Sequence, residues 1–327
     1  MAAKTRWGII GTGNIARQFA RGLAALSEAE LVAVGSRSQE TADTFGDLFH
    51  VPHRHASYEA VAEDSAVDAV YIGTPHSFHR DNSLLCLSHG KAVLTEKPFA
   101  INAQQAQEVV DFARAHKIFL MEAMWTRFLP IFVRMRELLA AQTIGEVRML
   151  TADFGFRTHF NPEGRLFNPA LGGGALLDVG IYPLSLASMV FGPPERITSM
   201  AHRGETGVDE NTAIILGYEG GALASLTTAV RTNTPQVATL NGTEGRITVH
   251  SRWWIPTRMT VEIYGKETAE IEMPFVGNGY NYEAAEVGRG LREGLLESDV
   301  MPLDETLSIM RTMDTIRAQW GQKYPME

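Results

Sequence analysis

The stretch RWGIIGTGNIA, residues 6–16, decides the fold of this chain. It begins with a short apolar run that is typical of a buried strand and that ends at Gly11. Beyond the turn, Ile15, Phe19 and Leu23 recur at intervals of four residues, which predicts a helix. The stretch therefore predicts a strand, a glycine-rich turn and a helix in immediate succession.

A Gly-x-Gly-x-x-Ala pattern between a strand and a helix is the context in which such a turn binds the pyrophosphate of a dinucleotide. Gly11 permits the tight turn, Gly13 lets the backbone approach the phosphates, and Ala16 allows close packing of helix on strand. The helix N-terminus adds amide donors and the positive end of a dipole. A glycine turn in an unrelated α/β protein is the alternative. The predicted cofactor contacts are Gly11, Thr12, Gly13, Asn14 and Ile15.

The end of the second strand indicates which dinucleotide is bound. The apolar strand 31–34 is followed by Gly35, Ser36 and Arg37, and no carboxylate occurs before Glu40. A site for NAD usually has an acidic residue here, which binds the ribose 2′-hydroxyl. A guanidinium and hydroxyl groups suit a 2′-phosphate instead. We therefore predict NADP(H) as the cofactor, in contact with Ser36 and Arg37; a solvated surface arginine is the alternative for Arg37.

Strands and helices alternate in the first part of the chain. Further apolar strands are expected at 69–72, 92–95 and 119–121, and Asn102 can cap a helix between the last two. This alternation predicts an α/β fold, a parallel doubly wound sheet covered by helices on both faces. We assign residues 1–122 to this NADP-binding Rossmann domain.

After about Glu122 the pattern changes to alternating strands with tight turns. The clearest hairpin occupies residues 212–229 and turns at Gly220-Gly221. Residues 123–327 are therefore expected to form an α+β domain with a large, mostly antiparallel open-faced sheet. The closing helix, 303–320, is able to pack back on the first domain.

The overall composition argues against several classes of protein. The chain has 327 residues, of which 45% are hydrophobic and 20% charged, as in ordinary globular proteins. Its net charge of -9 argues against a nucleic-acid-binding face. No apolar stretch is expected to approach the roughly 20 residues that span a bilayer, and Met1 stands too close to the first strand for a signal peptide. Cys86 is the only cysteine, so a disulfide within the chain is impossible. We expect a cytoplasmic protein with no nucleic-acid or membrane partner.

Four stretches resemble the glucose-fructose oxidoreductase/inositol dehydrogenase (Gfo/Idh/MocA) family. They are the glycine turn 11–16, Thr74-Pro75 with His79, Glu96-Lys97-Pro98, and GGALLDVGIY at residues 173–182. The resemblance spans both predicted domains. The lysine motif is specific when it follows a Rossmann half, whereas the glycine motif alone is not.

One departure narrows the resemblance to a branch of the family. Many members have a histidine four residues after the aspartate of the last motif, where this chain has Tyr182. Tyrosine there looks like the dimeric dihydrodiol dehydrogenase branch, which includes NADP-dependent D-xylose dehydrogenases. The patterns Trp125-x-Arg127-Phe128-x-Pro130 and Trp254-x-Pro256-Thr257 look like that branch too.

The resemblance implies that residues after the fourth and fifth strands also contact the cofactor. It suggests that the Lys97-Pro98 peptide bond is cis. It also implies that residues 123–327 are the substrate-binding and oligomerisation domain, whose antiparallel sheet forms the interface of a homodimer or higher homo-oligomer. A surface loop position is the alternative for His76 and His79. The implied contacts are Thr74, Pro75, His76, His79, Glu96 and Lys97.

Three side chains give a hypothesis for the chemistry. Asp178 and Tyr182 are four residues apart on a predicted helix, 175–190, so both project from one face. We expect Tyr182 to be the acid/base, with its pKa lowered from about 10 by the ammonium of Lys97. Lys97 would hydrogen-bond the reacting oxygen, and Asp178 would hold a substrate hydroxyl and orient the lysine. The alternatives are a surface lysine and a buried Asp178–Tyr182 pair that supports the helix.

The substrate pocket is expected to combine aromatic walls with guanidinium groups that bind hydroxyls. Core packing is the alternative for the aromatic residues. The predicted substrate-binding residues are Trp125, Arg127, Phe154, Arg157, Asp178 and Tyr182.

No metal site is predicted. His50, His53 and His55 resemble a metal cluster, but no carboxylate follows them until Glu59.

These features together predict an NADP-dependent oxidoreductase. It would transfer a hydride between the nicotinamide and a secondary alcohol or hemiacetal of a small-molecule polyol or sugar. The two leading substrates are an aldose such as D-xylose, slightly favoured by two arginines, and a trans-dihydrodiol. A keto-sugar or anhydro-sugar reductase is the alternative within the family. A non-catalytic NADP or sugar sensor is the alternative from another class, and the presence of the lysine, aspartate and tyrosine argues against it.

Overall fold

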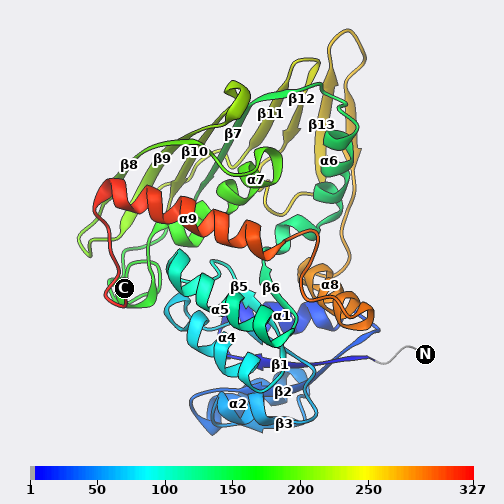
Figure 1. Ribbon diagram of the computed structural model, residues 1–327, viewed down its shortest axis with the longest axis vertical. Coiled ribbons are helices and arrows are strands. Elements are labelled where there is room, and N and C mark those ends of the chain that lie inside the picture. Colours follow the sequence, from blue (N-terminus) through cyan, green and yellow to red (C-terminus); the bar gives the residue numbers. More distant parts are fainter. Residues whose placement is uncertain (1–3) are drawn as a thin grey trace. The chain divides into compact units, whose positions relative to one another are not determined.

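The computed structural model describes residues 4–327, which form two compact units (Figure 1). The first unit comprises residues 4–125 and 276–307, and the second comprises residues 126–275 and 308–327. Met1, on which the expectation of a missing signal peptide rests, lies outside the described residues. The domain boundary between residues 122 and 123 stays a prediction.

The first unit contains a six-stranded parallel sheet with the strand order β3-β2-β1-β4-β5-β6. This order is that of a doubly wound Rossmann sheet, so the predicted α/β fold is confirmed. Every residue of β4 and β5 is buried, which explains why these strands read as continuous apolar runs. The strands are β1 (Thr5–Ile10), β2 (Ala29–Gly35), β3 (His53–His55), β4 (Ala69–Ile72), β5 (Ala92–Glu96) and β6 (Leu120–Ala123).

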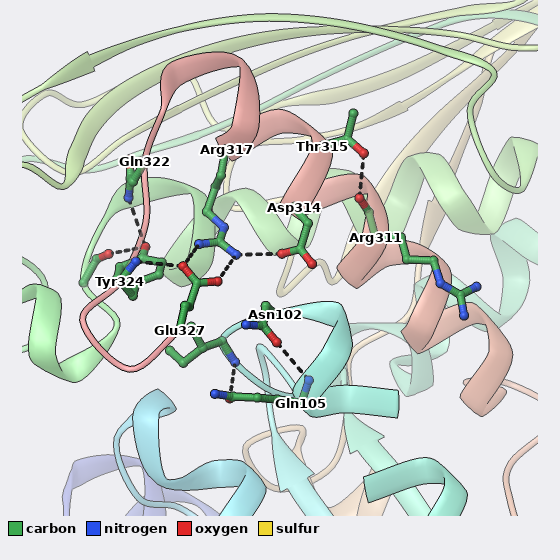
Figure 2. Close-up of polar contacts among 11 residues, drawn as sticks. Asn102, Gln105, Arg311, Asp314, Thr315, Arg317, Gln322, Tyr324 and Glu327 are labelled. Atoms are coloured by element: carbon green, nitrogen blue, oxygen red, sulfur yellow. Dashed lines mark hydrogen bonds and ion pairs between the residues drawn. The ribbon is translucent and has the colours of Figure 1, made fainter. Parts of the chain in front are cut away.

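Helices connect these strands. Asn102 caps α5 as predicted, because its side-chain oxygen accepts a hydrogen bond of 2.8 Å from the amide of Gln105 (Figure 2). The later helix α8 packs against α1. The helices of this unit are α1 (Asn14–Leu23), α2 (Gln39–Phe49), α3 (Glu59–Glu63), α4 (His79–Ser88), α5 (Ala103–His116) and α8 (Tyr280–Glu293), with the 3₁₀ turn η1 (His76–Phe78).

The second unit contains an eight-stranded sheet with the order β14-β13-β12-β11-β7-β10-β9-β8. Every neighbouring pair is antiparallel except β7 and β10, so the predicted mostly antiparallel sheet is confirmed. The predicted hairpin is β9 and β10, joined by η5 (Glu219–Gly221). The strands are β7 (Val147–Gly155), β8 (Arg196–Arg203), β9 (Asp209–Gly217), β10 (Leu223–Ala229), β11 (Ala238–Gly242), β12 (Gly245–Val249), β13 (Arg258–Ile263) and β14 (Ala269–Glu272).

The helix predicted at residues 175–190 is not a uniform α-helix. It begins with a π-helical turn, η4 (Leu176–Gly180), and continues as α7 (Ile181–Phe191). Both segments pack against β7 and β10. The remaining helical elements are η2 (Trp125–Phe128), α6 (Pro130–Ala140), η3 (Pro169–Leu171) and α9 (Leu303–Trp320).

One helical stretch of the described residues, Pro169–Phe191, is long and apolar enough to cross a membrane by length and composition. The expectation that no apolar stretch approaches this length is wrong for this segment. However, 78% of its most apolar window is buried inside the protein, as in the core helix of a globular domain.

Candidate active site

The glycine turn between β1 and α1 has the geometry that a dinucleotide requires. Gly11 has a φ of +100°, and a Cβ there would lie 2.9 Å from the carbonyl oxygen of Gly73, so the position requires glycine. A Cβ at Gly13 would meet nothing within 4 Å. Gly13 immediately precedes α1, whose first amides and dipole favour an anion. The turn therefore fits a pyrophosphate.

The residues around the turn divide into exposed and packed positions. Asn14 is exposed, and Thr12 and Ile15 are half-buried. Ala16 is fully buried, and the next apolar position of the helix, Phe19, stacks on Tyr71 of β4 with 3.8 Å between ring centroids. The predicted close packing of helix on sheet is thus present.

The end of β2 presents the residues expected to select the cofactor. Ser36 is buried, and its hydroxyl shares a hydrogen bond with that of Thr41. Arg37 is exposed and forms no hydrogen bond or ion pair with any residue from 4 to 327. Its guanidinium is therefore available to an anionic ligand.

His79 links the segments that follow β4 and β5. It is fully buried, with Nε2 2.9 Å from the carbonyl oxygen of Thr74 and Nδ1 2.8 Å from that of Pro98. Thr74 also accepts a hydrogen bond of 3.0 Å from Asn82 on its hydroxyl. The Lys97–Pro98 peptide bond is cis, as the resemblance suggests. His79 thus fixes the two segments to each other, while its position near a nicotinamide stays a prediction.

Pro75 and His76 lie at the start of η1. His76 is buried, and its ring centroid lies 5.6 Å from that of His79. Both histidines are buried, so neither lies in a surface loop, which was the alternative interpretation.

Glu96, which precedes Lys97, is one of two buried glutamates near each other. The Tyr71 hydroxyl donates a hydrogen bond to Glu96, which also accepts one of 3.2 Å from the amide of Lys97. Glu283 of α8 is fully buried, and burial and the nearby Glu96 carboxylate raise its pKa well above the ordinary value. Lys97 itself is half-buried. Sequence reasoning missed Glu283, because nothing in its local pattern distinguishes it from a surface glutamate.

In the second unit, Asp178 lies in the π-helical turn and Tyr182 in the first turn of α7. Asp178 is buried, and its Oδ1 lies 2.6 Å from Nη1 of Arg165. Sequence reasoning missed Arg165. Tyr182 is 8% exposed, with its ring centroid 5.3 Å from that of Phe154. π-turns occur often at functional sites.

A buried carboxyl group caps this helical segment. Asp209 accepts a hydrogen bond of 2.6 Å from the amide of Leu176 and one of 3.2 Å from Gln322. Burial raises the pKa of Asp209 to about 7. A Cβ at Gly174 would lie 2.2 Å from Oδ1 of Asp209. The glycines before the helix therefore allow the backbone to approach a side chain of the protein itself.

The C-terminal residues support the same segment. The Tyr324 hydroxyl donates a hydrogen bond of 2.6 Å to the carbonyl oxygen of Gly173. Figure 2 shows that Tyr324 also donates its amide to Glu327, and that Arg317 forms ion pairs with Glu327 and Asp314. Sequence reasoning gave no role to Tyr324, because Gly173 lies 151 residues away along the chain.

The predicted substrate-binding residues occupy different environments. Phe154 stacks on Trp254 at 3.5 Å between ring centroids. Arg127 is buried, and its guanidinium donates hydrogen bonds of 2.9 and 2.7 Å to the hydroxyl and carbonyl oxygens of Ser185. Arg157 is exposed. In the first unit, Trp125 stacks on Tyr280 with 4.6 Å between centroids.

Known protein families match both the Rossmann part and the C-terminal part of this chain. Residues 5–124 match the family described as "Oxidoreductase family, NAD-binding Rossmann fold", and residues 132–248 match "GFO/IDH/MocA C-terminal domain". Trans-1,2-dihydrobenzene-1,2-diol dehydrogenase of Mus musculus is 39% identical over 334 residues, which cover 98% of each chain.

Two solved structures share the fold. A 3-ketoreductase from Actinomadura kijaniata, in complex with NADP and TDP-benzene, is 25% identical with a TM-score of 0.85 over 96% of this chain and 97% of that chain. An aldose-aldose oxidoreductase from Caulobacter crescentus is 24% identical with a TM-score of 0.89 over 98% of each chain. On the extent of these matches, the chain belongs to the GFO/IDH/MocA family of oxidoreductases, with an NAD-binding Rossmann fold as its first part.

Proposed function

We propose that the protein is an NADP-dependent dehydrogenase that oxidises a cyclic trans-dihydrodiol. The observation that carries this choice is the aromatic group of Tyr182, Phe154 and Trp254. Phe154 stacks on Trp254, and the ring of Tyr182 is tilted against Phe154. Such an aromatic group suits an unsaturated ring, and Asp178, four residues before Tyr182, offers a carboxylate to its hydroxyls. The name of the relatives that match over 98% of the chain supports the same substrate.

The choice of NADP over NAD rests on the end of β2. Arg37 is exposed there without an ionic partner among residues 4–327, and no carboxylate precedes Glu40. We propose that Arg37 and Ser36 bind the 2′-phosphate, and that Gly11, Gly13 and the start of α1 bind the pyrophosphate. NADP, when bound, supplies the hydride acceptor.

The proposed chemistry of the chain is proton transfer. Tyr182 takes the proton of the reacting hydroxyl, and the ammonium of Lys97 favours the resulting phenolate by Coulomb attraction. Asp178 holds a second hydroxyl of the substrate. Arg165 orients this carboxylate through its contact of 2.6 Å.

An aldose such as D-xylose is the second candidate, because the Asp178–Arg165 pair also suits a polyhydroxylated ring. The argument from two arginines is weaker than the sequence predicts, since the guanidinium of Arg127 binds Ser185. Keto-sugar reduction is the same chemistry in the reverse direction.

A substrate panel tests the proposal. Purified protein is mixed with NADP or NAD and with trans-1,2-dihydrobenzene-1,2-diol, D-xylose or myo-inositol, and reduced cofactor is followed by absorbance. We expect NADPH formation with the dihydrodiol and a preference for NADP. Turnover of D-xylose alone would move the assignment to aldoses. If no substrate of the panel is oxidised although the protein still binds NADPH, a keto-sugar reductase or a sensor is favoured.

We further propose a homo-oligomer formed through the open face of the eight-stranded sheet. Met200, Ile215, Leu223 and Met149 are exposed apolar side chains of β8, β9, β10 and β7, and Met200 is 77% exposed. Sedimentation velocity should show at least a dimer, and Met200→Asp should weaken it. A wild-type monomer at high concentration would contradict this. A cytoplasmic location is also proposed, and cell fractionation tests it.

A further inference from the structure

Two histidines and an aspartate come together at the edge strand β3 of the Rossmann sheet, where the carbonyl oxygen of His55 also accepts a hydrogen bond of 3.1 Å from the amide of Ser36. His53 Nδ1 lies 2.6 Å from Asp64 Oδ2, and His55 Nε2 lies 3.0 Å from the same oxygen. One ligand atom from each of the three residues lies within 4.8 Å of the others. No metal site was predicted, because in the sequence no carboxylate follows these histidines until Glu59. In the folded protein, the carboxylate that contacts them is that of Asp64.

The local structure places these side chains on one side of the edge strand. His53 and His55 are two residues apart on β3, so they project from the same face. Arg54 between them projects oppositely, and its guanidinium forms an ion pair of 2.6 Å with Asp47. The charge of Arg54 is therefore directed away from the histidines.

The aspartate is held in place before any ligand arrives. Asp64 ends α3, and its second carboxylate oxygen accepts a hydrogen bond of 2.9 Å from the amide of Ala66. Lys91 donates hydrogen bonds of 2.7 and 2.9 Å to the carbonyl oxygens of Asp64 and Val67. Such outer contacts orient a ligating carboxylate and are expected to raise metal affinity.

The charged side chains around the cluster do not oppose a cation. The nearby Arg6 is neutralised by an ion pair of 2.6 Å with Asp68. The side chain of His53 is 44% exposed, so an ion can enter from solvent.

We propose that His53, His55 and Asp64 form a binding site for a divalent transition-metal ion such as Zn²⁺. Two imidazoles and a carboxylate are a ligand set that suits Zn²⁺ and other transition ions rather than Mg²⁺ or Ca²⁺, which prefer oxygen. Tetrahedral metal–ligand bonds of about 2.0–2.2 Å place ligand atoms about 3.3–3.6 Å apart, so both nitrogen–oxygen distances must lengthen from their present 2.6 and 3.0 Å when an ion binds. Solvent completes the coordination, and the ion fastens the three-residue edge strand to the end of α3.

A metal ion binds an imidazole nitrogen only when that nitrogen carries no proton. Affinity should therefore fall as the pH is lowered, because protons and the ion compete for the same imidazole nitrogens. Cys86, the only thiol in the sequence, is fully buried and offers no competing surface ligand.

Calorimetric titration of untagged, chelator-treated protein with Zn²⁺ tests this site. We expect one ion per chain, and an affinity lower by about tenfold or more in His55→Gln and in Asp64→Asn. His50→Asn is the matched control, since it removes a neighbouring exposed histidine outside the cluster and should bind like the wild type. Mg²⁺ should not bind at this site.

Thermal unfolding provides the second measurement. Zn²⁺ should raise the melting temperature of the wild type and of His50→Asn, because it binds only the folded site, and should not raise that of Asp64→Asn. The proposal is overturned if the wild type shows no saturable binding, or if binding is unchanged in both His55→Gln and Asp64→Asn. Either result would identify the cluster as a set of hydrogen bonds only. Neither measurement depends on the proposed enzymatic activity.

Discussion

Two glycine turns of this protein, residues 11–16 and 172–174, both precede a helix, yet they use glycine in opposite ways. At Gly13 the space that a Cβ would occupy is open. At Gly174 that space is filled by Asp209, and at Gly173 by three carbonyl oxygens at 2.9–3.0 Å. The first turn leaves room for a ligand, whereas the second is packed against the protein and fixes the helical segment that carries Asp178. Residue type alone does not distinguish the two uses.

The largest effect is expected at the filled turn. Gly174→Ala forces a side chain into a backbone with φ of +119° and against Asp209. Strain and overpacking together should lower the free energy of unfolding by about 2–6 kcal/mol. Urea denaturation measures this. If Gly174→Ala unfolds with the same free energy as the wild type, the second turn is not packed against the protein as described.

The cap of the same turn should make stability depend on pH. Burial raises the pKa of Asp209 to about 7, so the folded state holds a proton that the unfolded state has released above about pH 4. The contribution of this group is therefore present below about pH 4 and is lost as the pH rises to about 7, by up to about 4 kcal/mol in total.

Comparison with Asp209→Asn isolates this contribution from those of other groups. The stability of the wild type relative to the variant should decrease between pH 5 and pH 7 and then level off. Urea denaturation at each pH measures the difference. A difference that stays constant across this range would show that Asp209 is already ionised in the folded protein.

At the open turn, effects should appear in cofactor binding. Arg37→Ala removes a guanidinium from the proposed 2′-phosphate site, which should weaken NADP binding by about 10- to 100-fold and leave NAD binding nearly unchanged. Fluorescence titration with both cofactors measures the two affinities. Equal losses for NADP and NAD would point to adenine stacking by Arg37 instead.

The smallest change in stability is expected for Gly13→Ala, because the added methyl group meets nothing within 4 Å. Unfolding free energy should stay within about 0.5 kcal/mol of the wild type, while NADP binding weakens because the backbone can no longer approach the pyrophosphate. A loss of stability similar to that of Gly174→Ala would contradict the comparison directly.

The sequence could predict features that depend on local patterns, but not those that depend on contacts between distant residues. The Rossmann sheet and its glycine turn follow from local apolar runs and a motif in its required context, and both were predicted. The parallel pairing of β7 with β10 depends on long-range topology that no local period encodes. Asp209 and Tyr324 were missed because their partners, Leu176 and Gly173, are 33 and 151 residues away.

Single residues show the same limit. The burial of Arg127 against Ser185 is invisible in a motif that contains only Arg127, and the pairing of Arg165 with Asp178 crosses a loop without a recognisable pattern. The contact of Asp64 with His53 and His55 was missed for the same reason, because it depends on how α3 follows β3 in space. Motifs predicted the chemical groups of the site, and the fold determined their neighbours.

The most direct test of the proposed function is the turnover of Tyr182→Phe and Lys97→Met with NADP and trans-1,2-dihydrobenzene-1,2-diol. Lys266→Met, which changes an exposed lysine, serves as the control. If Tyr182 and Lys97 handle the proton, each variant should lose about 10²- to 10⁴-fold in turnover while its melting temperature and NADP binding stay close to those of the wild type. Undiminished turnover in either folded variant, or no NADPH formation by the wild type, would contradict the account.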